Sequence, residues 1–367
     1  MTLPLAGLRV LDLTRVLAGP LCTMTLGDLG ADVLKIERPG EGDETRGWGP
    51  PFDPRGESAY FLSINRNKLS AALDLDVEND RLLLHRLIAG ADVVVDNFRP
   101  GTLERRGFDP AKLVAVHARL VWCTLTGFGP TSARPGYDFV VQAGWGWMAI
   151  TGEPDGVPMK VGVALADVIA GKDAVVAVLA ALAARDRLSA AGRRLGVSLA
   201  HSAASALVNV AQNALVSGEE PRRWGNAHPN LVPYQLFHTA DRPIVIAVGN
   251  DAQWLACCRA LGRDDLAAEP AFGTNAGRVE GRERLVASLR DTLARAGAAV
   301  WLERLAARGV PAGVVRPVRE VLAEVGADPL TGVAPAAPAA VRRPPPRLDE
   351  HGEAVRRQGW RVFEGPG

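Results

Sequence analysis

Short apolar runs alternate with amphipathic stretches through the first third of the chain. The alternation of Leu73 and Leu75 with aspartates predicts one short strand. Further apolar runs predict strands over residues 8–13, 32–36, 92–95 and 120–124, and helical spacing predicts helices over 21–30, 78–89 and 110–117. Strands separated by helices indicate a mainly parallel sheet with helices on both faces. The predicted fold is therefore α/β, with a large Rossmann-like domain.

The second half of the chain begins with helical patterns and then changes to a smaller α+β pattern. An alanine-rich helix is predicted over 166–188 and another over 200–217, which Gly218 ends. Strands are then predicted over 234–239, 244–248 and 313–315, with helices over 251–261, 282–294 and 300–307. Residues 334–346 hold five prolines and predict an extended arm, which a short helix over 351–359 follows.

These patterns divide the chain into two domains, as expected for 367 residues. The large domain covers residues 1–195 and is completed by a C-terminal arm over 318–367. The small domain covers residues 200–317. Because residues 334–346 of this arm have little hydrophobic pattern of their own, we expect them to lie along another surface, such as a dimer contact.

Charge and cysteine content exclude several classes of protein. The formal net charge of +1 argues against a nucleic-acid partner. Four cysteines show no CxxC pair or other metal-ligand spacing, so we expect reduced thiols and no metal. The first eight residues do not resemble a secretory signal, and the longest apolar run, 174–184, is about half the length that a membrane span needs. A soluble protein of the cytoplasm, without membrane partners, is predicted.

The turn after the first strand tests the dinucleotide-binding interpretation. A Rossmann fingerprint needs GxGxxG there, because the pyrophosphate approaches the backbone closely. Residues 15–20 (RVLAGP) contain one glycine and a proline. The pattern therefore argues against a nicotinamide or flavin enzyme.

A series of motifs through nearly the whole chain resembles a known enzyme family. The series runs GLRVLDLTR (7–15), AGP (18–20), LGDLGADV (26–33), KIERPG (35–40), NFRPG (97–101), TGFG (126–129), ADV (166–168), HPN (228–230), PYQ (233–235) and LDEH (348–351). In order and spacing it resembles the family III CoA-transferases of the CaiB/BaiF group. This family includes formyl-CoA transferase, the carnitine CoA-transferase and α-methylacyl-CoA racemase. The resemblance implies an interlocked homodimer and coenzyme A as co-substrate.

Asp167 is the residue to which the resemblance gives the central role. An aspartate at the start of a long helix is ordinarily a cap or first-turn residue that complements the helix dipole. The same position would keep a carboxylate ionised and oriented, as a nucleophile requires. The resemblance implies that Asp167 is this nucleophile. It would form a mixed anhydride and then an aspartyl-CoA thioester while CoA passes between two carboxylic acids.

The resemblance also implies a set of CoA contacts. CoA needs cations and backbone donors for its phosphates and a flat surface for its adenine. Arg38 is expected at the adenosine end and Arg105 at a phosphate, while Asn97 ends a predicted strand, where ligands of open α/β sheets bind. The full set is Val16, Leu17, Ala18, Arg38, Leu73, Asp74, Leu75, Asp76, Asn97, Phe98, Arg99, Arg105, Tyr137 and Asp138.

Two departures from family patterns narrow the reaction. The racemase branch has a histidine where this chain has Tyr137, and a phenol with an ordinary pKa of about 10 is a poor base near neutral pH. No glycine run like that of formyl-CoA transferase lies between Gly218 and Gly262. Residues 224–230 (WGNAHPN) instead resemble relatives that use succinyl-CoA with dicarboxylates. A racemase-type isomerase and a non-catalytic CoA- or nucleotide-binding protein remain open alternatives.

Two polar residues of that segment have alternative interpretations. His228 is either a turn residue beside Pro229 or a contact to the second carboxylate of an acceptor acid. Asn230 is grouped with it as a candidate substrate contact.

Overall fold

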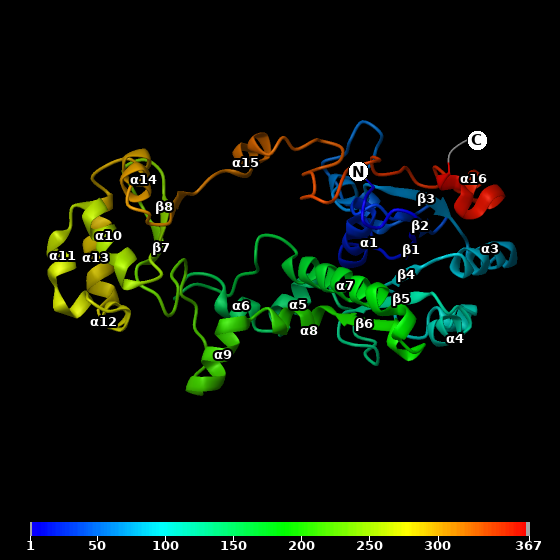
Figure 1. Cartoon of the computed structure of the whole chain (residues 1–367), viewed down its shortest axis with the longest axis horizontal. Coiled ribbons are helices and arrows are strands. Elements are labelled where there is room, and N and C mark those ends of the chain that lie inside the picture. Colours follow the sequence, from blue (N-terminus) through cyan, green and yellow to red (C-terminus); the bar gives the residue numbers. More distant parts are fainter. Residues whose placement is uncertain (1, 365–367) are drawn as a thin grey trace. The chain divides into compact units, whose positions relative to one another are not determined.

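The computed structural model describes residues 2–364 of the chain (Figure 1). The chain forms two compact units. Unit 1 consists of Met1–Trp147, Lys160–Glu219 and Val325–Gly367, and unit 2 consists of Met148–Met159 and Glu220–Glu324. Residues 200–219, which the sequence analysis assigns to the small domain, thus lie in unit 1, and residues 148–159 lie in unit 2.

Unit 1 is built on a six-stranded sheet in which all pairings are parallel. Its strands are β1 (Arg9–Leu13), β2 (Asp32–Glu37), β3 (Lys68–Ala72), β4 (Val93–Asp96), β5 (Val121–Thr126) and β6 (Arg194–Ser198), in the order β3-β2-β1-β4-β5-β6. The predicted α/β class with a parallel sheet is confirmed. The chain order reverses between β1 and β4, and ligands of such sheets bind at the carboxyl ends of strands beside that point.

The predicted strand around Leu73 and Leu75 is wrong. The strand β3 comes earlier, over Lys68–Ala72, and every one of its residues is buried. The polar Lys68 and Ser70 make this segment look like a surface loop in the sequence. Both are buried because they bind carboxylates: Lys68 Nζ lies 2.9 Å from Asp12 Oδ2, and Ser70 Oγ donates to Glu37 Oε1 at 2.6 Å. After the strand, the Asp80 carboxylate accepts a hydrogen bond from Asp74 N at 2.8 Å, which begins a turn.

The helices of unit 1 include all those predicted, one of them broken in two, together with three short helices that were not predicted. They are α1 (Ala18–Asp28), α2 (Ala59–Leu62), α3 (Glu78–Ala89), α4 (Pro110–Val116), α5 (Asp138–Gly144), α7 (Leu165–Ala184), α8 (Leu199–Ser205), α9 (Val208–Ser217) and α16 (Gly352–Gln358), and α6 (Trp147–Ile150) lies at the boundary with unit 2. The three that were not predicted are α2, α5 and α6. The single helix predicted over 200–217 is wrong, because Val208 adopts a φ of 38° and separates α8 from α9. Gly218 ends α9 in the left-handed conformation, as predicted.

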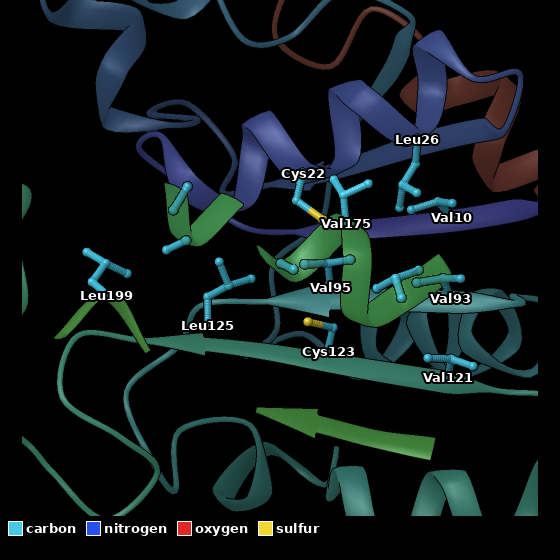
Figure 2. Packing of buried hydrophobic residues seen from close by; sticks show 14 of the residues in the cluster. Val10, Cys22, Leu26, Val93, Val95, Val121, Cys123, Leu125, Val175 and Leu199 are labelled. Atoms are coloured by element: carbon cyan, nitrogen blue, oxygen red, sulfur yellow. The ribbon is translucent and has the colours of Figure 1, made fainter. Parts of the chain in front are cut away.

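Helices cover both faces of the sheet in unit 1. On one face, α1 and α7 pack side chains such as Cys22 and Val175 against Val95 and Cys123 of the strands (Figure 2). On the other face, α3, α4 and α16 cover Trp122 and its neighbours. The site described below lies where α1 and α7 begin.

The C-terminal arm lies on the surface of its own unit. Arg343 O accepts a hydrogen bond from Asn67 N at 3.0 Å, and Asp28 O accepts one from Ala340 N at 2.9 Å. The Asn67 side chain also accepts from Arg342 N at 2.6 Å. The arm thus lies along another surface, as expected, and this surface belongs to its own unit, where hydrogen bonds take the place of a hydrophobic pattern.

Unit 2 is an α+β unit with an antiparallel three-stranded sheet. Its strands are β7 (Tyr234–Phe237), β8 (Ile244–Ala247) and β9 (Ala312–Val314), in that order. Its helices are α10 (Asp251–Leu261), α11 (Asp264–Ala268), α12 (Asn275–Glu280), α13 (Arg282–Leu293), α14 (Ala298–Ala306) and α15 (Val318–Glu324). Across residues 2–364, none of the helices has the length and apolar character that crossing a membrane requires.

Candidate active site

Asp167 lies in the first turn of α7, with only 8% of its surface exposed. The residue before it is fixed from another helix, because Ala166 N donates a hydrogen bond of 2.8 Å to Asp138 Oδ1. Asp138 begins α5 and also accepts from Gln142 Nε2 at 2.7 Å. The start of α7 is thus held by a second carboxylate, which places two acidic side chains close to each other.

Burial raises the pKa of Asp167 to about 7, and the charge of Asp138 adds to the shift. The sequence analysis expects the helix N-terminus to keep this carboxylate ionised. The structure does not bear out that expectation, because loss of solvent and a neighbouring negative charge both favour the protonated form. Near neutral pH, Asp167 is therefore divided between its acid and carboxylate forms.

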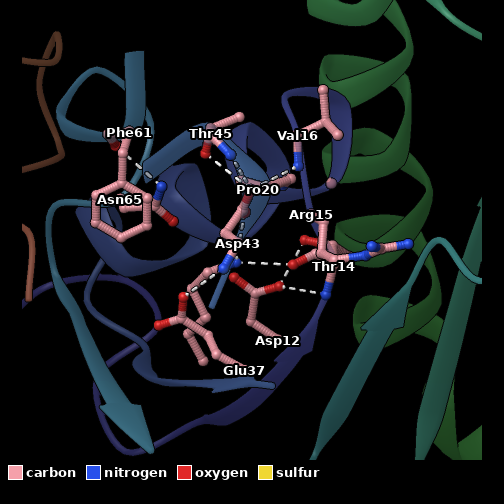
Figure 3. Close-up of polar contacts among 12 residues, drawn as sticks. Asp12, Thr14, Arg15, Val16, Pro20, Glu37, Asp43, Thr45, Phe61 and Asn65 are labelled. Atoms are coloured by element: carbon pink, nitrogen blue, oxygen red, sulfur yellow. Dashed lines mark hydrogen bonds and ion pairs between the residues drawn. The ribbon is translucent and has the colours of Figure 1, made fainter. Parts of the chain in front are cut away.

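The turn after β1 approaches Asp167 in a strained conformation. Val16 has a φ of 72°, a region that β-branched residues rarely adopt, and its N–H donates to Asp43 Oδ1 at 3.3 Å (Figure 3). The Asn97 side chain binds the backbone of Arg15, the residue before Val16. Its Oδ1 accepts from Arg15 N at 3.1 Å and its Nδ2 donates to Arg15 O at 2.7 Å. Two side chains from elsewhere in the chain thus hold this turn.

A network of buried charges lies below the same turn. Lys35 Nζ is 3.1 Å from Asp43 Oδ2 and also donates to Thr14 O at 2.7 Å. Lys68 Nζ is 2.9 Å from Asp12 Oδ2, and all four charged side chains of these two pairs are fully buried. Burial opposes the charge of Asp12, but the two lysines outweigh it and hold its pKa well below the usual range. The paired charges anchor the turn to the centre of the sheet.

A glycine lets α7 pack directly against this turn. A Cβ atom on Gly171 would lie 2.6 Å from Ala18 O. Only glycine permits this approach, which brings the start of α1 next to the first turns of α7.

Two adjoining cavities of unit 1 collect most of the predicted site residues. A cleft of about 180 Å³ is lined by Asp167 together with Val16, Leu17, Ala18, Asn97, Phe98, Arg99 and Tyr137. A larger cavity of about 760 Å³ is lined by Arg38, Leu73, Asp74, Leu75 and Asp76. Phe98, Arg99 and Tyr137 line both, so the two cavities adjoin. Together they can hold an elongated ligand with one end at Asp167.

Two predicted CoA contacts do not line these cavities. Asp138 is engaged with the start of α7, as described above. Arg105 donates a 3.4 Å hydrogen bond to Thr102 Oγ1, whereas its neighbour Arg106 lines the larger cavity and forms an ion pair of 3.3 Å with Asp76. Chain position alone could not distinguish the two arginines, because the short helical turn that carries them decides which one faces inward.

His228 and Asn230 lie in unit 2 and form a local turn. His228 Nδ1 accepts a hydrogen bond from Asn230 N at 3.0 Å, and the imidazole ring lies 5.1 Å from the ring of Tyr234. Burial and the nearby Arg282 lower the pKa of His228. These contacts match the turn interpretation of His228.

Two residues near Asp167, Tyr60 and Arg134, were not predicted as site residues. Burial raises the pKa of Tyr60 to about 12, with further contributions from the charges of Asp167 and Asp138. Arg134 lines the cleft of Asp167. The only signal for Arg134 was its position three residues before Tyr137, and Tyr60 gave none. The residues that the structure describes contain no group of His, Cys, Asp and Glu arranged to hold a metal ion.

Comparisons with known proteins agree on one family. A sequence model described as CoA-transferase family III matches residues 5–334. The chain is 38% identical to the succinyl-CoA:glutarate CoA-transferase of Mus musculus, covering 99% of this chain and 88% of the relative. It is 40% identical to the succinate–glutarate CoA-transferase of Agrobacterium fabrum, covering 88% of this chain and 82% of the relative.

A solved structure gives the same result for the fold. The crystal structure of a CaiB/BaiF family protein from Brucella suis superposes with a TM-score of 0.84 at 41% sequence identity. The superposition covers 98% of this chain and 100% of that protein.

Proposed function

Because the chain belongs to the CoA-transferase family III, we propose that it carries coenzyme A from an acyl-CoA thioester to a carboxylic acid through a covalent intermediate on Asp167. The observation that carries this proposal is the buried carboxylate of Asp167 in a cleft that also contains the Val16–Ala18 backbone. A protein that merely binds CoA has no use for a carboxylate there, since burial makes its charge costly.

The two cavities supply what CoA needs as a substrate. Arg38, Arg99 and Arg106 line the larger cavity and can neutralise phosphate oxygens. Leu75 and Phe98 offer apolar surface for the adenine or the pantetheine arm. We assign the larger cavity to the nucleotide end of CoA and the cleft to the thioester.

The first half of the proposed reaction loads CoA onto the enzyme. A carboxylate oxygen of Asp167 attacks the thioester carbonyl of the donor, and the C–S bond breaks to give a mixed anhydride and CoA thiolate. The thiolate then attacks the Asp167 carbonyl carbon. The bond between that carbon and the bridging oxygen breaks, the donor acid leaves as a carboxylate that keeps this oxygen, and an aspartyl-CoA thioester remains.

The second half repeats these steps in reverse. A carboxylate oxygen of the acceptor attacks the aspartyl thioester and displaces the thiolate, which gives a second mixed anhydride. Attack of the thiolate on the acceptor acyl carbon forms the new acyl-CoA and returns the Asp167 carboxylate. No proton or electron is gained or lost, so the site needs a nucleophile and exclusion of water rather than an acid–base pair.

The names of the relatives support a dicarboxylate exchange. The mouse and Agrobacterium relatives are named for succinyl-CoA or succinate and glutarate. We propose a succinyl-CoA or similar dicarboxylate pair for this chain. Racemisation is not favoured, since Tyr137 occupies the place of the histidine in the racemase branch and the named relatives are transferases.

The proposed working form is a homodimer in the cytoplasm. Helix α9 of unit 1 has no buried residue, and its Leu215 and Val216 are each 78% exposed. An apolar helix face of this kind is typical of a surface covered by a partner. All four cysteines are free and buried, which fits a reducing compartment.

A substrate panel tests the proposal. The purified enzyme is incubated with several acyl-CoAs crossed with several carboxylates, and new thioesters are identified by mass. We expect transfer between dicarboxylates and none with Asp167→Ala. Loss of optical purity of a chiral 2-methylacyl-CoA without transfer to any acid would favour the isomerase instead.

A further inference from the structure

Three arginines line the cleft of Asp167, and they are not equivalent. Arg15 forms an ion pair with Glu44 at 3.8 Å, and both Arg15 and Arg99 also line the larger cavity. Arg134 lines only the Asp167 cleft of these two cavities. Among residues 2–364, no carboxylate forms an ion pair with Arg134. Its positive charge is therefore available to a ligand on the side of the cleft away from the assigned CoA cavity.

An aromatic pair holds the Arg134 guanidinium in place. The guanidinium carbon lies 4.2 Å from the ring centroid of Phe128 and 5.8 Å from that of Trp145, and the two rings are 4.9 Å apart. Both rings pack against the hydrophobic core of unit 1. A cation–π contact does not use up the N–H donors of a guanidinium as hydrogen bonds to a carboxylate do, so these donors stay available to a carboxylate.

The two ends of the loop that carries Arg134 meet at its base, at Gly127 and Gly136. A Cβ atom on Gly127 would lie 2.5 Å from Gly136 Cα, and one on Gly136 would lie 2.2 Å from Gly127 Cα. Only two glycines permit this approach. Gly127 O also accepts a hydrogen bond from Ala200 N at 3.0 Å, which ties the base to α8. The loop thus presents Arg134 from a fixed base, two residues before Gly136.

We propose that Arg134 binds the second carboxylate of a dicarboxylic acid while the first carboxylate reacts at Asp167. This inference rests on the proposed CoA transfer. The reacting carboxylate loses its charge when it becomes an anhydride or a thioester. The second carboxylate keeps its charge throughout, so an unpaired arginine near Asp167 can hold it in every state. Arg134 then selects dicarboxylates over monocarboxylates without taking part in bond making.

The test compares two acceptors that differ in one charge. Glutarate and its monoamide have the same chain length, but the monoamide lacks the second carboxylate. Initial rates with succinyl-CoA are measured for the wild type, Arg134→Gln and Arg134→Lys. In a ping-pong reaction, kcat/KM for the acceptor does not depend on how the donor binds. The matched control is Arg119→Gln, since Arg119 is 67% exposed and lines neither cavity.

Arg134→Gln should lower kcat/KM for glutarate about 10- to 100-fold, as expected for loss of a charge-assisted hydrogen bond. It should change the value for the monoamide less than about threefold, and Arg134→Lys should restore part of the glutarate value. Equal losses with both acceptors, or a wild type that prefers the monoamide, would overturn the role of Arg134 and leave CoA transfer intact. A wild type that transfers CoA to neither acid would overturn the proposed function itself.

Discussion

Asp167 occupies an environment that opposes its own charge. Burial and Asp138 raise its pKa to about 7, from an ordinary value near 3.8. A nucleophile must be ionised to attack, but a carboxylate with a raised pKa is also a stronger base and is less well stabilised by solvent. The burial that makes the Asp167 carboxylate more reactive therefore also lowers the stability of the folded chain when this group is ionised.

The raised pKa predicts how activity depends on pH. Below pH 7, Asp167 is mostly protonated and cannot attack, so kcat/KM for the acyl-CoA should fall about tenfold per pH unit. Above pH 8 it should be constant. Initial rates from pH 5 to 9 check this expectation, and a profile that stays flat down to pH 5 would contradict it.

The same pKa can be measured without catalysis. Between about pH 4 and 7 the unfolded chain has an ionised Asp167, whereas the folded chain keeps the proton. Wild-type stability should therefore fall with rising pH relative to Asp167→Asn, with a difference that grows to about 4 kcal/mol by pH 8. Urea unfolding of both proteins across this range measures the difference. A difference that does not change with pH would mean that Asp167 has an ordinary pKa.

At the scale of elements, the strained turn between β1 and α1 depends on buried charges from β2 and the segment after it. Holding a β-branched residue at a positive φ costs on the order of 1–3 kcal/mol. Asp43 offsets that cost because it accepts the Val16 N–H and is paired with Lys35. The backbone that faces Asp167 is thus positioned in part by Asp43 and Lys35, which line neither cavity.

Removing one of these charges should therefore weaken both stability and activity. Asp43→Asn keeps the shape but leaves Lys35 with one fewer carboxylate, and the expected loss of unfolding free energy is about 3 kcal/mol. The kcat/KM for the acyl-CoA should also fall. The matched control is Glu353→Gln, where an 83% exposed carboxylate pairs with Arg357 and no measurable change is expected. Urea unfolding measures the loss of stability, and initial rates measure the loss of activity. If Asp43→Asn and Glu353→Gln have the same unfolding free energy and the same kcat/KM, Asp43 does not anchor the turn.

The same elements show which parts of the fold a pattern can predict. The helices Glu78–Ala89 and Asp251–Leu261 were predicted with their observed bounds, because their apolar spacing is regular. The strand Lys68–Ala72 was missed, since its buried Lys68 reads as a surface residue. The edge strand Arg194–Ser198 was missed because it is short, half-exposed and contains Gly196.

The candidate site divides in a similar way. Asp167 and the Val16–Ala18 turn were recognised from short motifs. The raised pKa of Asp167 could not be predicted in this way, because burial depends on which helices pack together rather than on local sequence. Tyr60 and Arg134 were missed for the same reason, since only the folded chain brings them to the site.

At the scale of the whole molecule, the exposed apolar face of α9 points to self-association. Residues 340 and 343 of the arm form hydrogen bonds within their own unit, whereas α9 has no buried residue and can be covered by a second copy of the chain. Sedimentation at micromolar concentration should give twice the 38.9 kDa chain mass. Leu215→Glu combined with Val216→Glu should weaken association, since each places a charge on this face.

Val116→Glu is the matched control for the dimer. Val116 is 75% exposed at the end of α4, so the same change of residue tests a similar surface elsewhere. It should leave the dimer intact. A wild-type protein that is active and monodisperse as a monomer would contradict the proposed interlocked dimer.

The central claim is that CoA passes through a covalent bond to Asp167. The enzyme is incubated with succinyl-CoA, treated with hydroxylamine and digested, and the peptide that contains Asp167 is weighed and fragmented. The account predicts an aspartyl hydroxamate at Asp167, formed only with the acyl-CoA present and absent from Asp167→Asn. Continued transfer of CoA by Asp167→Asn at near wild-type rate, or a hydroxamate on another residue, would contradict it.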